Sequence, residues 1–63
     1  MSALLNPDDV STLLGLSKGH LAHLRQRGEG PAYVKLGTAV RYRLSDVEDF
    51  ISAARIKTAG GGR

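Results

Sequence analysis

The sequence predicts one α+β domain, with three short helices and a β-hairpin between the second and third of them. Three observations predict it. Two stretches with helical spacing of apolar residues, 7–14 and 18–27, are separated by only three residues. Apolar and polar residues then alternate over 33–44, and a third helical pattern follows from residue 45. A chain of 63 residues has room for a single small core, since a domain of this size buries only about 60% of its unfolded surface.

The first helix is expected to begin after Asn6, a residue type that caps helices, with Pro7 at the first helical position. Gly15 is expected to end it, because glycine accepts the left-handed conformation found there. The predicted core face of this helix follows the i, i+3, i+4 spacing and consists of Val10, Leu13 and Leu14.

The second helix is expected to run from Lys18 to Arg27, between a cap at Ser17 and a stop at Gly28. The joint between the two helices is then three residues long, which is the spacing of a helix-turn-helix. In a helix-turn-helix, the second helix is free to enter a groove. The residues of this helix predicted to face the core are Leu21 and Leu24.

Residues 33–36 and 40–44 are predicted to be the strands of a hairpin around the connection Gly37-Thr38-Ala39. Because side chains alternate between the faces of a strand, one set of residues should face inward. This inward set is Val34, Leu36, Val40, Tyr42 and Leu44. The set expected to point the other way is Lys35, Arg41 and Arg43.

The third helix is predicted to start with a capping box formed by Ser45 and Glu48. Its apolar stripe is Val47, Phe50, Ile51 and Ala54. We expect the domain to span residues 4–56. The glycine-rich stretch 57–63 is expected to form a flexible C-terminal tail.

The charge is concentrated in one part of the chain. The net charge is +3, but residues 18–43 contain six lysines and arginines against one acid, Glu29, a net charge of +5. A concentrated basic segment favours a polyanionic partner, although a merely solvated surface has the same composition.

Several classes of function are disfavoured. The chain has no cysteine, and His20 and His23 have no third histidine or thiolate to complete a metal site, so no metal or other cofactor is expected. The acids at the helix starts are explained by capping and by the helix dipole, and no nucleophile has the partners of a triad, so we do not expect an enzyme. No apolar run approaches a membrane span and no signal peptide is recognisable, which favours a cytoplasmic protein without membrane association.

The second helix carries a face suited to contact with base edges. Opposite Leu21 and Leu24, it presents residues that are small or able to hydrogen-bond. These are Gly19, Ala22, His23 and Gln26, flanked by Lys18, Arg25 and Arg27 as phosphate contacts. Gly19 costs about 1 kcal/mol relative to alanine, which fits either close approach of a partner or a frayed first turn. His20 is expected beside the core boundary.

The order and spacing of these elements resemble a known family. The motifs on which the resemblance rests are "LLNPDDV", "LLGLS", "LAHLRQRG", "PAYVKLG", "VRY" and "SDV". Together they resemble the small MerR-like winged helix-turn-helix proteins of the excisionase group, also called recombination directionality factors. The resemblance implies a recognition helix in the major groove and a hairpin wing on the minor groove of double-stranded DNA. The implied DNA-binding residues are Ser17, Lys18, Gly19, Ala22, His23, Arg25, Gln26, Arg27, Lys35, Thr38, Arg41 and Arg43.

The resemblance implies an architectural protein that bends DNA and controls the direction of integrase-mediated recombination during prophage excision. The sequence ends about ten residues into the third helix, without the long dimerisation helix of full MerR-type regulators, so a bare DNA-binding unit is expected. Such a unit should bind weakly alone, which favours repeated sites and cooperative self-association. An integrase partner and a phage or mobile element in a bacterial cytoplasm are implied. The alternatives are a small transcription regulator and a protein-interaction module that docks through the same helix.

Overall fold

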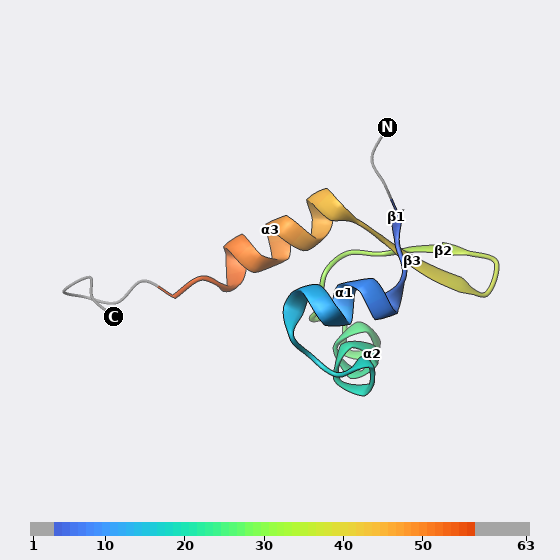
Figure 1. Ribbon diagram of the computed structural model, residues 1–63, viewed down its shortest axis with the longest axis horizontal. Helices are drawn as coiled ribbons and strands as arrows, with labels where there is room; N and C mark the ends of the chain where they lie inside the picture. Colours follow the sequence, from blue (N-terminus) through green and yellow to red (C-terminus); the bar gives the residue numbers. More distant parts are fainter. Residues whose placement is uncertain (1–3, 57–63) are drawn as a thin grey trace.

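The computed structural model describes residues 4–56. Their elements are β1 (Leu4–Leu5), α1 (Pro7–Leu14), α2 (Lys18–Arg27), β2 (Val34–Leu36), β3 (Ala39–Arg43) and α3 (Leu44–Ala54) (Figure 1). Three helices with a hairpin between the second and third confirm the predicted α+β class, and the arrangement is that of a winged helix-turn-helix. The stretch 57–63, predicted to be a flexible tail, lies outside the described residues.

Both helices of the helix-turn-helix begin and end where the capping residues predict. The Asn6 side chain accepts a hydrogen bond from the Asp9 backbone N–H at 2.8 Å, and the Asp9 carboxylate accepts one from the Asn6 N–H at 3.3 Å. Ser17 Oγ accepts a hydrogen bond from the His20 N–H at 3.0 Å. Gly15 and Gly28 close the two helices with φ of 68° and 70°, values that favour glycine.

The core lies where α1, α2, β3 and the start of α3 meet. Each of these elements contributes one fully buried side chain, and these four are Val10, Leu21, Tyr42 and Val47. Leu5, Leu14 and Val40 pack against them and are half-buried. Because each element buries only one side chain completely, each of these four side chains contributes a large share of the free energy of unfolding.

Two leucines predicted to face the core are less buried than expected. Leu13 is 56% exposed, because the core lies on the Leu14 side of α1. Leu24 is half-buried, and Gly30 covers it at short range: a Cβ at Gly30 would lie 3.2 Å from the Leu24 Cβ. A side chain at position 30 would therefore contact Leu24 closely, and Leu24 would have to shift by a few tenths of an ångström.

The sheet has a third strand that the sequence did not reveal. β1 pairs antiparallel with β3, with Leu5 opposite Tyr42, so the strand order is β1-β3-β2. A strand of two residues is too short to show alternation. Its pairing places β3 in the centre of the sheet.

The predicted hairpin register is wrong by one residue. Ala39 belongs to β3 and pairs with Leu36, which leaves the two-residue turn Gly37-Thr38. Val34 consequently lies opposite Arg41, and Lys35 opposite Val40. Cross-strand partners share a face, so the faces of β2 are reversed relative to the prediction.

The consequences of this register are visible in the exposure of the wing, which we define as β2, the turn and β3. Leu36 is 56% exposed, on the outer face that it shares with Arg41 and Arg43, instead of facing inward. Lys35 shares the face of Val40 and Tyr42 but is exposed. The wing basic residues are therefore divided between two faces.

The predicted capping box of the third helix does not form. α3 begins at Leu44, directly after β3, and its N-terminus at Arg43 has no side-chain hydrogen bond. Ser45 and Glu48 consequently lie inside the helix. Val47 and Tyr42 are both buried in the core and are only five residues apart in the sequence. Because α3 starts directly after β3, the chain turns early enough to place Val47 in the core. Leu44, predicted to face inward, is exposed.

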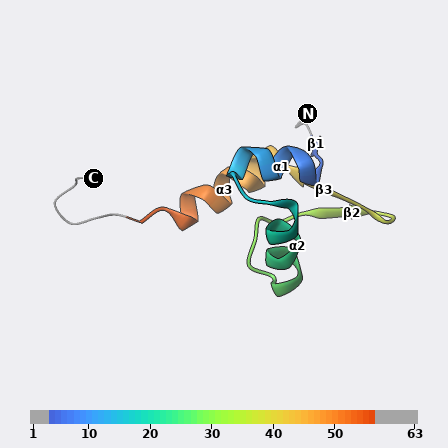
Figure 2. The same ribbon diagram turned by 60° about the horizontal axis from the view of Figure 1, so that its bottom comes forward.

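The predicted apolar stripe of α3 is buried only near the start of the helix. Val47 is in the core and Phe50 is half-buried, whereas Ile51 is 49% exposed and Ala54 is exposed. The reason is that α3 packs mainly on β3 and then leaves the body of the domain. Figures 1 and 2 both show α3 and the wing extending in opposite directions from the helix pair. No helix of residues 4–56 is long and apolar enough to cross a membrane.

Candidate nucleic-acid interface

The outer face of α2 has the composition that the helical phase predicts. Gly19, His23 and Gln26 are exposed, whereas Ala22 is half-buried at the edge of this face. His20 is exposed as well, not beside the core boundary as expected. The exposed centre of the helix therefore carries neutral hydrogen-bonding groups and one glycine, without lysine or arginine.

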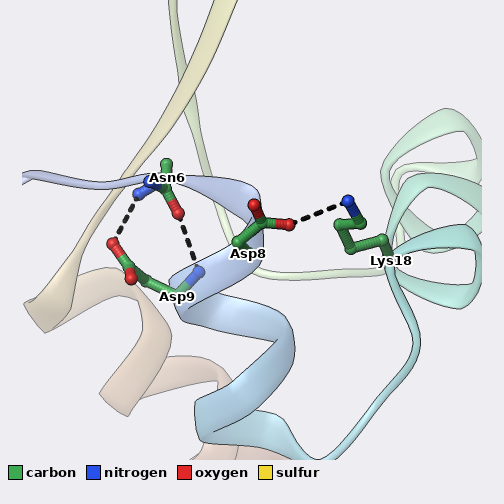
Figure 3. Close-up of polar contacts among 4 residues, drawn as sticks. All are labelled: Asn6, Asp8, Asp9 and Lys18. Carbon is green, nitrogen blue, oxygen red and sulfur yellow. Dashed lines mark hydrogen bonds and ion pairs between the residues drawn. The ribbon is translucent and has the colours of Figure 1, made fainter.

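Lys18, at the start of α2, is paired with an acid of the preceding helix. Its Nζ lies 3.0 Å from Oδ1 of Asp8 (Figure 3). The neighbouring Asp9 turns to Asn6 and completes the helix cap, so the two adjacent aspartates have different partners. Both side chains of the Lys18–Asp8 pair are about two-thirds exposed, at 67% and 69%, which leaves the lysine accessible to an external anion.

Arg27, at the other end of α2, is also paired. Its Nη2 donates to Oε2 of Glu29 at 3.3 Å, and both side chains are more than half exposed. Glu29 directly follows Gly28, and the left-handed turn of that glycine brings the carboxylate back toward the end of the helix. Each end of the helix therefore holds one cation next to one carboxylate.

Arg25 points toward the sheet. Its guanidinium lies 5.8 Å from the centre of the Tyr33 ring, and Nη1 makes a long hydrogen bond of 3.5 Å to the Tyr42 hydroxyl. The two tyrosine rings are 6.1 Å apart and tilted by 53°. Arg25 is half-buried and connects α2 to the central strand, which is a different environment from the exposed flank where the sequence placed it.

The wing supplies cations of a different kind. Among residues 4–56, Lys35 and Arg43 are exposed and form no ion pair. Arg41 is half-buried, and its Nη1 donates to the backbone carbonyl of Val40 at 2.8 Å. Thr38 is exposed at the turn. Within the described part of the chain, the cations of the wing therefore have no carboxylate as an ion-pair partner.

The described part of the chain contains no group of three or more histidines, aspartates or glutamates that could hold a metal ion. Within that part, the side chains of His20 and His23 make no hydrogen bond, and the His20 backbone N–H donates to the cap at Ser17.

Sequence reasoning missed the two ion pairs and the Arg25 contacts. Glu29 carried a usable signal, because it lies two residues after Arg27. Asp8 carried none, since its partner is on another helix, and it was assigned only to the helix dipole. The two tyrosines were assigned to the hairpin without a link to Arg25.

The chain belongs to a family of helix-turn-helix domains, whose model matches residues 4–55. The match covers every helix and strand described above. No curated protein matches the sequence. Membership of this family indicates that the chain binds double-stranded DNA, and domains of this kind are typically not enzymes.

Proposed function

We propose that this protein is an excisionase, an architectural protein that binds repeated DNA sites, bends them, and favours excision by a partner integrase. The observation that carries DNA binding is the neutral exposed face of α2, with the wing extending beside it. The motif order from "LLNPDDV" to "SDV" supports the narrower assignment, since it resembles the excisionase group.

In this proposal α2 lies in the major groove. Gly19, His23 and Gln26 face the base edges, because a histidine ring and an amide can each donate and accept hydrogen bonds there. Ala22 and Ser17 lie at the edge of the contact. Gly19 lets the backbone approach, since no atom lies within 4 Å of the space that a Cβ would occupy.

In this proposal most of the basic residues contact DNA, and one of them, Arg25, supports the position of α2. Arg25 is held by Tyr33 and Tyr42, so its role is to fix α2 against the sheet. The phosphate and minor-groove contacts are Lys18, Arg27, Lys35, Arg41 and Arg43. Thr38, at the tip, meets the minor groove, whose negative potential favours arginine where the groove is narrow.

A salt titration tests DNA binding itself. With about five phosphates neutralised, log K for a short duplex should fall against log salt with a slope of about −4 to −5. Fluorescence anisotropy of a labelled duplex between low and moderate salt measures it. A slope near zero, or binding to protein ligands without binding to DNA, favours an interaction module instead.

Sequence reading is tested by two variants of α2 against one variant of its flank. His23→Ala and Gln26→Ala should reduce the preference for a selected site over random DNA, by about 1–3 kcal/mol for each base interaction that the variant removes. Arg27→Ala should weaken binding to both DNAs alike. Equal losses on both DNAs for all three variants would show that this face reads no bases.

The architectural role is tested on DNA shape. A circular-permutation gel should show a bend at the bound site, and a duplex with two adjacent sites should bind more tightly than two separate sites predict. Reconstituted recombination with an integrase then measures whether the protein shifts the reaction toward excision. Specific binding without bending, and without an effect on recombination, favours a small transcription regulator.

A further inference from the structure

The recognition helix α2 carries a cation at each end, and each of these cations is already paired with a carboxylate of the same chain. Lys18 Nζ lies 3.0 Å from Asp8, and Arg27 Nη2 lies 3.3 Å from Glu29. The two acids come from different segments, the first turn of α1 and the turn after α2. Nine residues at about 1.5 Å per residue separate the two cations, roughly 13 to 14 Å along the helix.

The remaining exposed surface of α2 has no further lysine or arginine. Arg25 is half-buried against the tyrosines, and the exposed groove-side residues are neutral. In the isolated protein the positive charge of α2 is therefore largely balanced locally. Among the described residues, the wing cations Lys35, Arg41 and Arg43 form no ion pair.

We propose that Asp8 and Glu29 lower the affinity for DNA, because they compete with DNA phosphates for Lys18 and Arg27. This inference rests on the proposed binding of DNA through α2. A phosphate that approaches either end of the helix must displace a carboxylate, and the displaced carboxylate then lies beside the negatively charged backbone.

The competition acts against DNA in general and is independent of base sequence. Binding to random DNA depends almost entirely on phosphate contacts. Binding to a selected site also has base contacts, which are unaffected by the acids. Because the same carboxylates must be displaced in both complexes, they lower the affinity for random and for selected DNA by about the same factor.

The test uses Asp8→Asn and Glu29→Gln in the full chain, with Glu48→Gln as the control. Glu48 is an acid on α3, a helix that packs on β3, and no ion pair involves it in the described residues. The control makes the same change in net charge. At 0.15 M salt the screening length is about 8 Å, so distant charge has little effect on binding.

Affinity for a random-sequence duplex and for a site selected by the wild-type protein is measured by anisotropy at 0.15 M salt. An exposed ion pair is worth about 0.2–1 kcal/mol, so each variant should bind random DNA roughly 1.5 to five times more tightly. The double variant should show about the product. The affinity for the selected site should rise by about the same factor, so that the preference for it is unchanged, and Glu48→Gln should change neither affinity by more than the error.

A double-mutant cycle assigns the effect to the pair. In a Lys18→Met background, Asp8→Asn should gain no more affinity than Glu48→Gln does. Asp8→Asn also removes a favourable interaction of the carboxylate with the dipole of α1. Glu29 lies outside the helices, so Glu29→Gln tests the competition without this second effect. Circular dichroism melts confirm that each variant is folded at the assay temperature.

The outcomes separate this inference from the proposed function. Salt-dependent binding by the wild-type protein, with Asp8→Asn and Glu29→Gln indistinguishable from Glu48→Gln, overturns the competition and leaves DNA binding intact. A gain on only one of the two DNAs also overturns the competition, since displacement of the carboxylates by phosphate does not depend on base sequence. A wild-type protein that binds no duplex even at low salt overturns both.

Discussion

The two halves of the molecule are held together in different ways. In residues 4–28, both helices start with a side-chain cap, end at a left-handed glycine, and have cations with intramolecular partners. In residues 34–54, α3 follows β3 with no side-chain cap, Leu36 and Ile51 are about half exposed, and Lys35 and Arg43 have no ion pair.

The difference indicates a division of work. In our proposal the helix pair is the preorganised surface that reads bases, and its two end cations are paired with carboxylates, which suits selective contact with base edges. The described cations of the wing form no ion pair and its strand β2 is mostly exposed, which suits early attraction to the phosphate backbone. Matched substitutions in the two halves test this division.

The largest expected difference concerns two leucines. Leu21→Ala removes a side chain that is only 1% exposed and should cost about 2–5 kcal/mol, enough to unfold much of a domain this small. Leu36→Ala, at a position that is 56% exposed, should cost less than about 1 kcal/mol. Urea or thermal denaturation followed by circular dichroism measures both. Similar losses would show that β2 is an integral part of the core.

Two glycines should respond to alanine with opposite signs. Gly37 has φ of +65° at the first turn position, so Gly37→Ala should destabilise the protein by about 1–2 kcal/mol. Gly19 lies in the first turn of α2 with open space around it, so Gly19→Ala should stabilise the protein by up to about 1 kcal/mol. Melting curves measure the signs. A stabilised Gly19→Ala variant that loses DNA affinity would support close approach of the backbone to DNA.

Two serines test the two kinds of helix start. Ser17 accepts a hydrogen bond at the start of α2, so Ser17→Ala should cost about 1 kcal/mol. Ser45 lies inside α3 and caps nothing, so Ser45→Ala should change stability by less than about 0.5 kcal/mol. Equal losses in chemical denaturation would mean that α3 is capped by Ser45 in solution.

The smallest expected change concerns two arginines in the DNA complex. Arg43→Met removes an exposed wing cation and should reduce the steepness of the salt dependence by about 0.9. Arg25→Met should weaken binding with an unchanged slope, because Arg25 supports α2 through Tyr33 and Tyr42. A reduced slope for Arg25→Met would make it a phosphate contact after all.

The limits of both helices of the pair could be predicted to the residue, because the capping signals act over three or four positions. Asn6, Ser17 and the glycines at 15 and 28 satisfy or release backbone groups of their own helix, and no distant residue can change that requirement. The exposed face of α2 followed from the same helical phase.

The hairpin register could not be predicted from its apolar pattern. A register is strongly specified only where one face of a strand is buried. Val40 and Tyr42 face the core, but β2 extends beyond it, so burial of Leu36 is not required. The two-residue turn with Gly37 at positive φ then decides the pairing, and it reverses the faces of Val34, Lys35 and Leu36.

By itself, the sequence determined the order of the elements, the limits of α1 and α2, and the neutral centre of the recognition face, because these depend on local backbone chemistry and helical periodicity. Only the tertiary structure decided the third strand, the start of α3, and the partners of the basic residues. These depend on contacts between distant segments: Leu5 beside Tyr42, Val47 in the core, and Asp8 beside Lys18. Basic residues that look alike in the sequence thereby become paired, half-buried or exposed cations.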